Sequence, residues 1–436
     1  MTYQETVEYL YAATPVFEKI GAGAYKEGLA NTHALDEHLN HPHRHFKTIH
    51  VAGTNGKGSV SHTLTAILQH TGLRVGLYTS PHLVDFRERI RVNGVCVSEA
   101  FVVDFVERHR TFFEPLHPSF FELTTAMAFD YFAQEEVDIA VIEVGLGGRL
   151  DCTNIITPLL SVITNISFDH TQFLGNTLPE IAAEKGGIIK EGIPVVIGEA
   201  DGQTRPVFER IASQKGAPII FAQDQPLILS VEEGPNHTLL YHTAEIGLLQ
   251  GQLSGACQPH NTRTVLTAIP LLREAGISIT DEAVRLGFSQ VCQTTGLMGR
   301  WQQLCQHPTV VCDTGHNVGG WQYIARQLKT QECRQLRIVF GMVDDKDINT
   351  VMDMLPHEAA YYFTKASSHR AISEEKVKAI GLSKGLEGQA YPSVKEAFEA
   401  ARKDASSDDF IFVGGSSYVV ADLLAVWEEI TCQPKG

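Results

Sequence analysis

The residues with the clearest chemical pattern form the segment G-T-N-G-K-G-S at positions 53–59. A β-branched run comes directly before it and a helical pattern directly after it, so we expect a turn between a strand and a helix. The N–H groups of such a turn bind phosphates, and the helix N-terminus adds a favourable partial charge. Lys57 would reach the outer phosphates, and the hydroxyl of Ser59 would help to hold Mg²⁺. The spacing differs from G-x-x-x-x-G-K-[ST], because Gly58 separates the lysine from the hydroxyl.

Two further polar residues follow apolar strands of the same pattern. Glu143 lies near the end of the strand D-I-A-V-I-E-V (138–144), and His170 comes soon after the next strand. The carboxyl ends of parallel strands face the crevice where ligands bind, so both residues are candidate metal ligands near the phosphate turn. An ion pair within the protein would explain Glu143 equally well, and a lone histidine is often structural. The glycines in G-L-G-G (145–148) would let the backbone approach a substrate closely.

Alternating strands and helices must position these residues. Continuous apolar strands separated by helices indicate a parallel sheet that is covered on both faces. Residues 226–255 have short strands and glycine turns, which predict a small β-rich subregion beside that sheet. A second α/β pattern begins after Q-T-T-G-L-M-G (293–299), which reads as a linker.

We therefore expect an α/β protein of two domains. The first (1–293) would hold the phosphate loop in a mainly parallel sheet, flanked by helices, with the small β subregion. A linker (294–299) would join it to a Rossmann-like α/β domain (300–436). A length of 436 residues agrees with more than one domain.

Composition excludes several classes of protein. The formal net charge of −16 argues against a broad nucleic-acid surface, which needs clustered Lys and Arg. The chain lacks an apolar run near the ~18 residues of a spanning helix, and its start does not resemble a signal peptide. Eight cysteines without a C-x-x-C pair indicate reduced thiols in a cytoplasm rather than disulfides or a zinc site.

Eight segments, in order along the chain, carry a resemblance to a known family. They are G-T-N-G-K-G-S (53–59), T-S-P-H-L-V-D-F-R-E-R-I-R-V-N-G (79–94), F-F-E-L-T-T-A (120–126), E-V-G-L-G-G-R-L-D-C-T-N (143–154), D-H-T-Q-F-L-G-N-T-L-P-E-I-A-A-E-K-G-G-I-I-K (169–190), G-R-W-Q (299–302), D-T-G-H-N-V-G-G (313–320) and G-G-S-S-Y-V-V-A-D-L-L (414–424). With them the chain resembles the bacterial folylpolyglutamate synthase/dihydrofolate synthase family of the Mur ligase superfamily.

The resemblance implies an ATP-dependent amide ligase that uses Mg²⁺ at two sites. ATP would phosphorylate a carboxylate of the pterin substrate, and the amine of L-glutamate would attack the acyl phosphate, releasing ADP and phosphate. The acceptor would be dihydropteroate, the γ-carboxylate of a folate, or both, and we expect both. The enzyme is expected to act as a cytoplasmic monomer on these small molecules, with neither nucleic acid nor membrane as a partner.

The resemblance also implies roles for individual residues. ATP would be bound by Gly53, Thr54, Asn55, Gly56, Lys57, Gly58 and Ser59, with Asn261 near the adenine and Arg300 and Asp313 at phosphate and ribose. One Mg²⁺ would be held by Ser80 and Glu143 and the second by His170. The pterin would be bound by Ser119, Phe120, Phe121, Glu122, Leu150, Asp151 and Cys152. A core position is the alternative for Phe121.

The implied catalytic residues are Lys57, Lys185 and His316, the last near the transferred phosphate. Lys185 matches a lysine that the family often carbamylates to N6-carboxylysine. A carbamate is an anion that can approach the metal site, whereas an ammonium would repel Mg²⁺. An unmodified or salt-bridged lysine is the alternative.

Three other functions fit the sequence less well. A peptidoglycan ligase would need an N-terminal UDP-binding domain, and only about 45 residues precede the phosphate-loop strand. A small-molecule kinase or switch ATPase would leave the second domain without a use. A non-catalytic binding protein would be expected to lose Lys57, Glu143 or His170, and all three are present.

Overall fold

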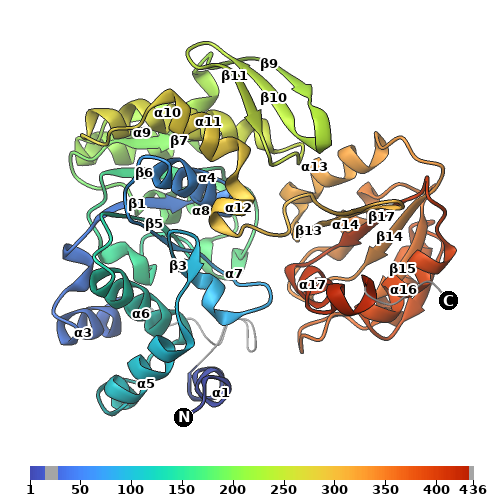
Figure 1. The fold of residues 1–436 in the computed structure, drawn as a ribbon, viewed down its shortest axis with the longest axis horizontal. Helices are drawn as coiled ribbons and strands as arrows, with labels where there is room; N and C mark the ends of the chain where they lie inside the picture. Colours follow the sequence, from blue (N-terminus) through green and yellow to red (C-terminus); the bar gives the residue numbers. More distant parts are fainter. Residues whose placement is uncertain (15–27, 432–436) are drawn as a thin grey trace. The chain divides into compact units, whose positions relative to one another are not determined.

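The structure, a computed structural model, describes residues 1–14 and 28–431. The chain divides into two compact units (Figure 1). The first unit contains residues 1–252 and 258–297, and the second contains residues 253–257 and those from 298 onward. The final crossing after Leu297 falls inside the segment expected as a linker, whereas the short excursion at 253–257 has no signal in the sequence.

The first unit is built on an eight-stranded sheet with the order β4-β3-β2-β5-β1-β6-β7-β8. The six strands from β2 to β8 in this order run parallel, and β3 and β4 extend the sheet in antiparallel fashion. The strands are β1 (Lys47–Ala52), β2 (Val75–Tyr78), β3 (Ile90–Val92), β4 (Val95–Cys96), β5 (Ile139–Glu143), β6 (Leu160–Ile163), β7 (Val195–Ile197) and β8 (Ile219–Phe221). The expected parallel sheet is confirmed.

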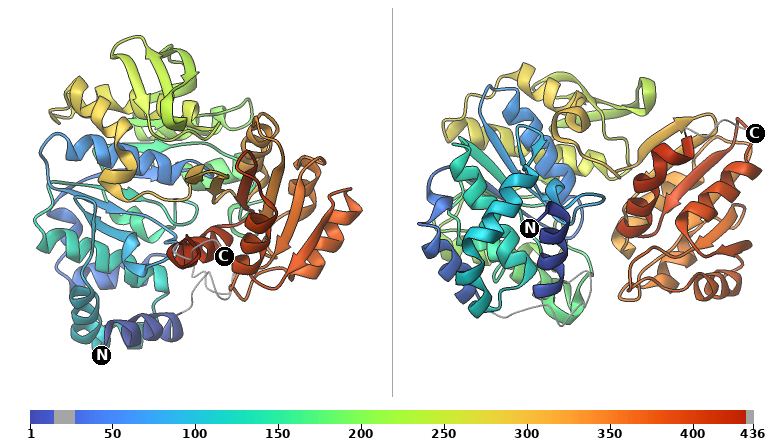
Figure 2. Two further views of the ribbon diagram at one scale, coloured as in Figure 1. Left: turned by 45° about the vertical axis from the view of Figure 1, so that its right-hand side comes forward. Right: turned by 60° about the horizontal axis from the view of Figure 1, so that its bottom comes forward.

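Helices cover both faces of this sheet (Figure 2). Strand β5 shows why the sequence is continuously apolar: Ile139 and Val141 join one buried cluster, while Ala140 and Ile142 join another on the opposite face. The helices of the first unit are α1 (Tyr3–Ala13), α3 (Ala30–His38), α4 (Lys57–Gln69), α5 (Glu99–Phe113), α6 (Phe120–Gln134), α7 (Thr171–Leu174), α8 (Leu178–Gly186), α9 (Arg205–Lys215), α10 (Gln258–Glu274), α11 (Asp281–Ser289) and α12 (Val291–Thr295). Helix α12 includes the start of the expected linker, so the segment 293–295 is helical rather than extended.

A separate antiparallel sheet confirms the β-rich subregion expected over 226–255. It consists of β9 (Ile228–Glu233), β10 (Leu239–Thr243) and β11 (Gly247–Gly251), in the order β11-β10-β9. Tyr241 and Leu249 are fully buried and join the same core cluster as α4 and α10. The small sheet therefore packs on the first unit through one of its faces.

The second unit has its own six-stranded sheet, in the order β12-β13-β17-β14-β15-β16. Only β12 runs antiparallel to its neighbour, as the expected hairpin requires. The strands are β12 (Gln302–Gln306), β13 (Thr309–Asp313), β14 (Leu336–Phe340), β15 (Ala360–Thr364), β16 (Gly388–Tyr391) and β17 (Phe410–Gly414). The helices are α13 (Val318–Lys329), α14 (Ile348–Met354), α15 (Glu374–Ser383), α16 (Val394–Asp404) and α17 (Ser417–Thr431). A core around the fully buried Trp321 makes this a second α/β unit in its own right.

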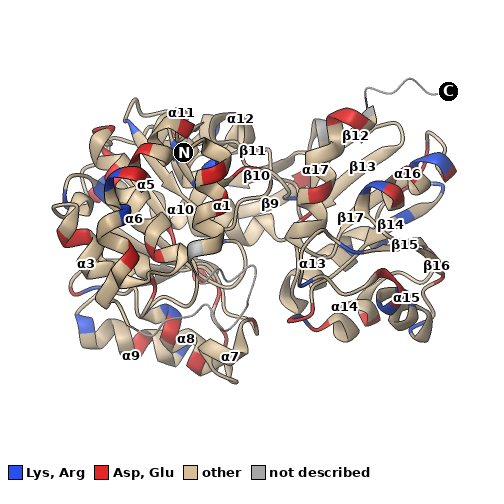
Figure 3. Ribbon diagram, turned by 90° about the horizontal axis from the view of Figure 1, so that it is seen from below, with Lys and Arg blue, Asp and Glu red and all other residues tan. Residues whose placement is uncertain are grey.

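Charged residues of both signs are mixed along the helices. Basic and acidic residues occur together on helices such as α5, α9 and α16 (Figure 3). Among residues 1–14 and 28–431, no helix is long and apolar enough to cross a membrane.

Candidate active site

The phosphate turn has the backbone that its glycines predict. Strand β1 ends at Ala52 and helix α4 begins at Lys57, and Gly56 at the helix N-cap has a φ of 84°. A Cβ atom on Gly56 would lie 2.3 Å from Oδ1 of Asn261, and one on Gly53 would lie 1.8 Å from Oγ1 of Thr164. Only glycine fits at these two positions, because the neighbouring side chains occupy the space of a Cβ.

The end of the adjacent strand β6 holds this turn in place. The backbone N–H of Thr54 donates to the carbonyl of Asn165 at 2.9 Å, and that of Asn55 donates to the Asn165 side-chain oxygen at 2.9 Å. The Asn55 side chain in turn donates to Oγ of Ser167 at 3.2 Å. The N–H groups of Thr54 and Asn55 thus serve the fold. In the first turn of α4, by contrast, helix geometry provides no acceptor for the N–H groups, which makes this turn the candidate phosphate site.

Two lysines donate to one carbonyl of the turn. Nζ of Lys57 donates to the carbonyls of Gly53 and Thr54 at 3.1 and 3.2 Å, and Nζ of Lys185 donates to that of Gly53 at 3.0 Å. Lys185 comes from α8 and is 5% exposed. Burial, and then the charge of Lys57, lower the pKa of Lys185 to about 7. Near neutral pH this amine is therefore partly uncharged.

A small, solvent-open hollow lies beside these groups. Its lining residues come from the phosphate turn, the start of α4, the loops after β5 and β6, α7 and α8: Gly53, Thr54, Lys57, Val144, Gly145, Leu146, Gly147, Asp169, His170, Leu174 and Lys185. His170 has a left-handed backbone (φ 49°), and its backbone N–H donates to Oδ1 of Asp169 at 2.9 Å. Sequence reasoning selected Lys57, His170 and Lys185 but missed Asp169. Its position directly before His170 is the signal that was available.

Glu143 and Ser80 lie close together at the carboxyl end of the sheet. Glu143 is 4% exposed and is paired in register with Val51, one residue before the end of β1. The backbone N–H of Ser80 donates to its Oε2 at 3.3 Å. A carboxylate and a hydroxyl oxygen are suitable ligands for Mg²⁺.

The residues expected to bind the pterin divide into two groups. Ser119 and Glu122 form the capping box of α6, in which the Ser119 N–H donates to Oε2 of Glu122 at 2.6 Å. Phe120 is 2% exposed and stacks on Tyr11 with centroids 5.0 Å apart. These three residues therefore stabilise the fold locally.

Phe121 and its surroundings keep a partly open face. Its ring stacks on Tyr78 at 5.7 Å, and a Cβ on Gly145 would lie 2.4 Å from its Cζ atom. Phe121 thus borders the glycine loop that lines the hollow. Leu150 and Cys152 are also partly exposed, and burial raises the pKa of the Cys152 thiol well above its ordinary value.

Asp151 shapes that glycine loop rather than facing outward. Its Oδ2 accepts from the N–H groups of Gly145 and Leu146 at 3.1 and 2.9 Å, and its Oδ1 accepts from the N–H of Thr153 at 3.0 Å. Burial raises the pKa of this carboxyl. Both oxygens are therefore used inside the protein.

Asn261 lies in α10 of the first unit, against the phosphate turn. Its Nδ2 donates to Oε1 of Gln258 at 3.1 Å, and Nε2 of Gln258 donates to Oγ of Ser59 at 3.3 Å. Sequence reasoning did not select Gln258. The hydrogen bond from Gln258 therefore links α10 to the first turn of α4, where Ser59 is 2% exposed.

The second unit groups its three candidates at the carboxyl end of β13. Asp313 accepts from the N–H groups of Trp301 and Gly315 at 2.7 and 2.8 Å, and burial raises the pKa of its carboxyl. Arg300 donates to Oγ1 of Thr314, and Nδ1 of His316 is 3.1 Å from the Thr314 carbonyl. Carboxyl ends of parallel strands are the usual ligand-binding edge of such a sheet.

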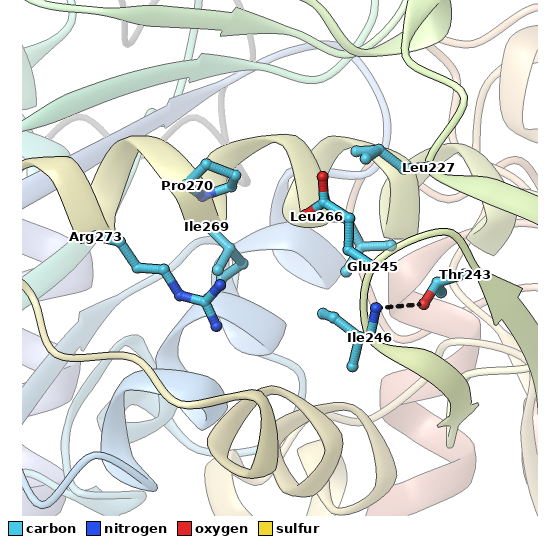
Figure 4. Close-up of a pocket in the computed structure, with 8 residues that line it drawn as sticks. All are labelled: Leu227, Thr243, Glu245, Ile246, Leu266, Ile269, Pro270 and Arg273. Carbon is cyan, nitrogen blue, oxygen red and sulfur yellow. Dashed lines mark hydrogen bonds between the residues drawn. The ribbon is translucent and has the colours of Figure 1, made fainter.

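Another hollow lies at the edge of the first unit, between the β10–β11 turn and α10 (Figure 4). Leu227, Thr243, Glu245, Ile246, Leu266, Ile269, Pro270 and Arg273 line it. None of the predicted site residues is among them, and most of the lining is aliphatic. We place the candidate active site at the phosphate turn.

Comparison with known proteins decides the family. A Mur ligase middle domain matches residues 51–227, and a Mur ligase glutamate ligase domain matches residues 299–417. The dihydrofolate synthase/folylpolyglutamate synthase of Bacillus subtilis is 33% identical over 97% of this chain and 98% of its own length. The chain belongs to the dihydrofolate synthase/folylpolyglutamate synthase family. The resemblance carried by the eight sequence segments is thereby confirmed.

Solved structures of this family share the whole fold. Escherichia coli FolC in complex with DHPP and ADP is 30% identical with a TM-score of 0.83, covering 99% of both chains. A bifunctional folylpolyglutamate synthase/dihydrofolate synthase with Mn, AMPPNP and L-glutamate bound is 30% identical with a TM-score of 0.81, covering 98% of both chains. As a member of the dihydrofolate synthase/folylpolyglutamate synthase family, this chain is an ATP-dependent ligase with the expected two-unit α/β fold.

Proposed function

We propose that this ligase joins L-glutamate both to dihydropteroate and to the γ-carboxylate of folates. One observation carries the proposal: Lys57, His170 and Lys185 line one hollow together with the glycine loop that Phe121 borders. A phosphate-binding turn beside an aromatic substrate surface suits the activation of a carboxylate by ATP. The Bacillus subtilis relative and the Mn-bound structure support both acceptors, because both are named for the two activities.

The chemistry assigned to the chain is positioning and charge neutralisation. The substrate carboxylate attacks the γ-phosphorus of ATP, forming an acyl phosphate and ADP; the glutamate amine then displaces phosphate and loses a proton. Lys57 and the first turn of α4 would bind the phosphate oxygens. The protein would accelerate the reaction by holding the two reactants in line, and it would form no covalent bond to either of them.

The oxygen donors of Ser80 and Glu143 fit Mg²⁺, and we assign His170 to a second ion. Ser80 and Glu143 would supply oxygen ligands to one ion and His170 an imidazole to the other. In the part of the chain that the structure describes, no group of three His, Cys, Asp or Glu side chains could hold a metal by itself. Mg²⁺ usually takes one or two protein carboxylates plus water and substrate phosphates, so the sparse donor set suits it. When bound, the ions neutralise the charge of the phosphates.

We assign Lys185 as a carbamylated lysine. Its amine is buried and its pKa is about 7, so a large fraction is uncharged and nucleophilic at neutral pH. The amine attacks CO₂, forming a carbamate and releasing one proton. With ¹³C-bicarbonate, the wild type should give a carbamate NMR signal that Lys185→Arg lacks; identical spectra would leave Lys185 as a plain lysine.

The remaining residues receive roles by their surroundings. Arg300 and Asp313 are assigned to phosphate and ribose of ATP and His316 to the transferred phosphate, supported by their grouping at the end of β13. Asn261 is assigned to the nucleotide, since it lies against Gly56.

The pterin is assigned to the partly open Phe121, Leu150 and Cys152. Flat aromatic rings stack on a face such as that of Phe121. Ser119, Phe120, Glu122 and Asp151 would support this surface from within the fold, because their side chains are already engaged there.

The test is phosphate release with ATP, Mg²⁺ and L-glutamate, run in parallel with dihydropteroate and with tetrahydrofolate. Glutamate-dependent turnover with dihydropteroate and also with tetrahydrofolate supports both activities. Turnover with tetrahydrofolate alone would make the enzyme a folylpolyglutamate synthase only. A rate of phosphate release that is the same with and without glutamate and acceptor would overturn the substrate assignment.

We further propose that the enzyme acts as a cytoplasmic monomer. The seven cysteines that the structure describes form no disulfide, which suits a reducing compartment. Light scattering at working concentration should give a mass near 48.0 kDa. A stable dimer mass would contradict the monomer.

A further inference from the structure

The short excursion of residues 253–257 is tied to the second unit by one side chain. Gln327 of α13 donates from Nε2 to the carbonyl of Ser254 at 3.0 Å and accepts from the N–H of Ala256 at 2.7 Å. The amide thus pairs with two alternate backbone groups, as a neighbouring strand would. We call residues 253–257 the strap.

Both ends of the strap are anchored in the first unit. Before it, the N–H of Gln252 donates to the carbonyl of Phe288 at 3.0 Å, and Oε1 of Gln252 accepts from the N–H of Cys292 at 2.8 Å. After it, Gln258 begins α10 and donates to Oγ of Ser59 in the first turn of α4. The residues on both sides of the strap are therefore held by hydrogen bonds within the first unit.

Covalent geometry makes the connection to the phosphate turn short. Two residues of chain span at most about 7 Å, so Ala256, held by Gln327, can lie no farther than that from Gln258. Gln258 is 4% exposed and accepts from Nδ2 of Asn261, whose Oδ1 fills the space beside Gly56. The strap is therefore linked through one intervening residue to the two side chains that contact the phosphate turn and the first turn of α4.

We propose that Gln327 is a positioning residue for the nucleotide: through the strap it sets Gln258 and Asn261 against the phosphate turn. The second unit thereby influences how the first unit binds ADP or ATP. The inference rests on the proposed function, since it concerns the same nucleotide site.

A double-mutant cycle on ADP affinity tests this. ADP with Mg²⁺ is titrated calorimetrically into the full-length wild type, Gln327→Ala, Gln258→Ala and the double variant. One or two neutral hydrogen bonds are worth about a threefold to tenfold change in affinity, so each single variant should raise the Kd by about that factor. Because both act along one path, the double variant should bind ADP no more weakly than Gln258→Ala alone.

Three comparisons make the outcome decisive. Gln322→Ala changes the same residue type on an exposed position of α13 and should leave the ADP affinity unchanged. Gln327→Ala should raise the KM for ATP with little change in the KM for the folate acceptor. An unchanged Kd in a folded Gln327→Ala variant, or losses that multiply in the double variant, would overturn the role of Gln327. A wild type that does not bind ADP would instead overturn the proposed function.

Discussion

At the scale of single residues, the carbonyl of Gly53 accepts from two lysine side chains. Burial and the charge of Lys57 lower the pKa of Lys185 to about 7, so near neutral pH the two amines are not both fully charged. Lys57 lines the hollow, and its Nζ donates to the carbonyls of Gly53 and Thr54 in the phosphate turn. The two lysines therefore have different tasks: one is a cation for phosphate, and the other is a latent neutral amine.

Lys57→Ala should remove catalysis and leave the fold intact. The side chain bonds only to carbonyls of the turn, so its loss creates no cavity in the core. We expect kcat for phosphate release to fall by roughly 10²–10³, the usual effect of removing one charge-stabilising donor. The melting temperature should stay nearly constant. Normal turnover in this variant would contradict the assignment of the phosphate turn.

Lys185 should impose a pH dependence on stability. Its pKa is about 7 in the folded chain against an ordinary 10.5, so between these values the unfolded chain binds more protons. Stability of the wild type relative to Lys185→Met should then rise with pH by up to about 1.4 kcal/mol per unit between pH 7 and pH 10.5. Below pH 7 the difference should be constant. Denaturant unfolding in CO₂-free buffer measures it, and parallel curves for the two proteins would contradict the shift.

At the scale of elements, the start of α6 contains one residue that stabilises the helix, Ser119, and one that we assign to the pterin, Phe121. Ser119→Ala removes the N-cap and should cost about 1 kcal/mol of stability while leaving the KM for the folate acceptor unchanged. Phe121→Ala removes the proposed stacking face and should raise that KM about tenfold. Denaturant unfolding and steady-state kinetics of both variants decide the matter. A raised KM for the folate acceptor in Ser119→Ala would show that Ser119 takes part in pterin binding.

Elements with strong local patterns were predictable from the sequence. The strand, turn and helix around 53–59, the apolar strand ending at Glu143 and the β subregion follow from periodicity and glycine placement, and the structure confirms them. The capping box of Ser119 and Glu122 was not predicted, because the family resemblance assigned both residues to the substrate. Helix α12 was missed because its short polar sequence resembles a linker.

Contacts between distant segments were beyond sequence reasoning. Gln258 meets Ser59 and Asn261 fills the space beside Gly56, although about two hundred residues separate each pair. The Asp151 carboxylate looked like a ligand for substrate, and only its hydrogen bonds to Gly145 and Leu146 reveal a structural task. Local patterns fix which elements form, whereas side-chain partners depend on how the elements pack.

At the scale of the whole molecule, the two units have separate hydrophobic cores. The clusters around α4, α6 and α8 belong to the first unit and the cluster around Trp321 to the second. Three crossings of the chain join the units, at 252–253, 257–258 and 297–298. Units with separate cores are expected to unfold in separable steps, so calorimetry should resolve two transitions.

ADP should then report which unit holds the nucleotide. A ligand stabilises the state that binds it, by about 2.7 kcal/mol at one hundred times the Kd. The residues assigned to the nucleotide include Lys57 and Asn261 of the first unit and Asp313 of the second, so both transitions should move to higher temperature with ADP and Mg²⁺. Asp313→Asn keeps the size of the side chain and should abolish the shift of the second transition while the first still moves. If ADP stabilises only the first transition of the wild type, the roles given to Arg300 and Asp313 are wrong and the first unit binds the nucleotide alone.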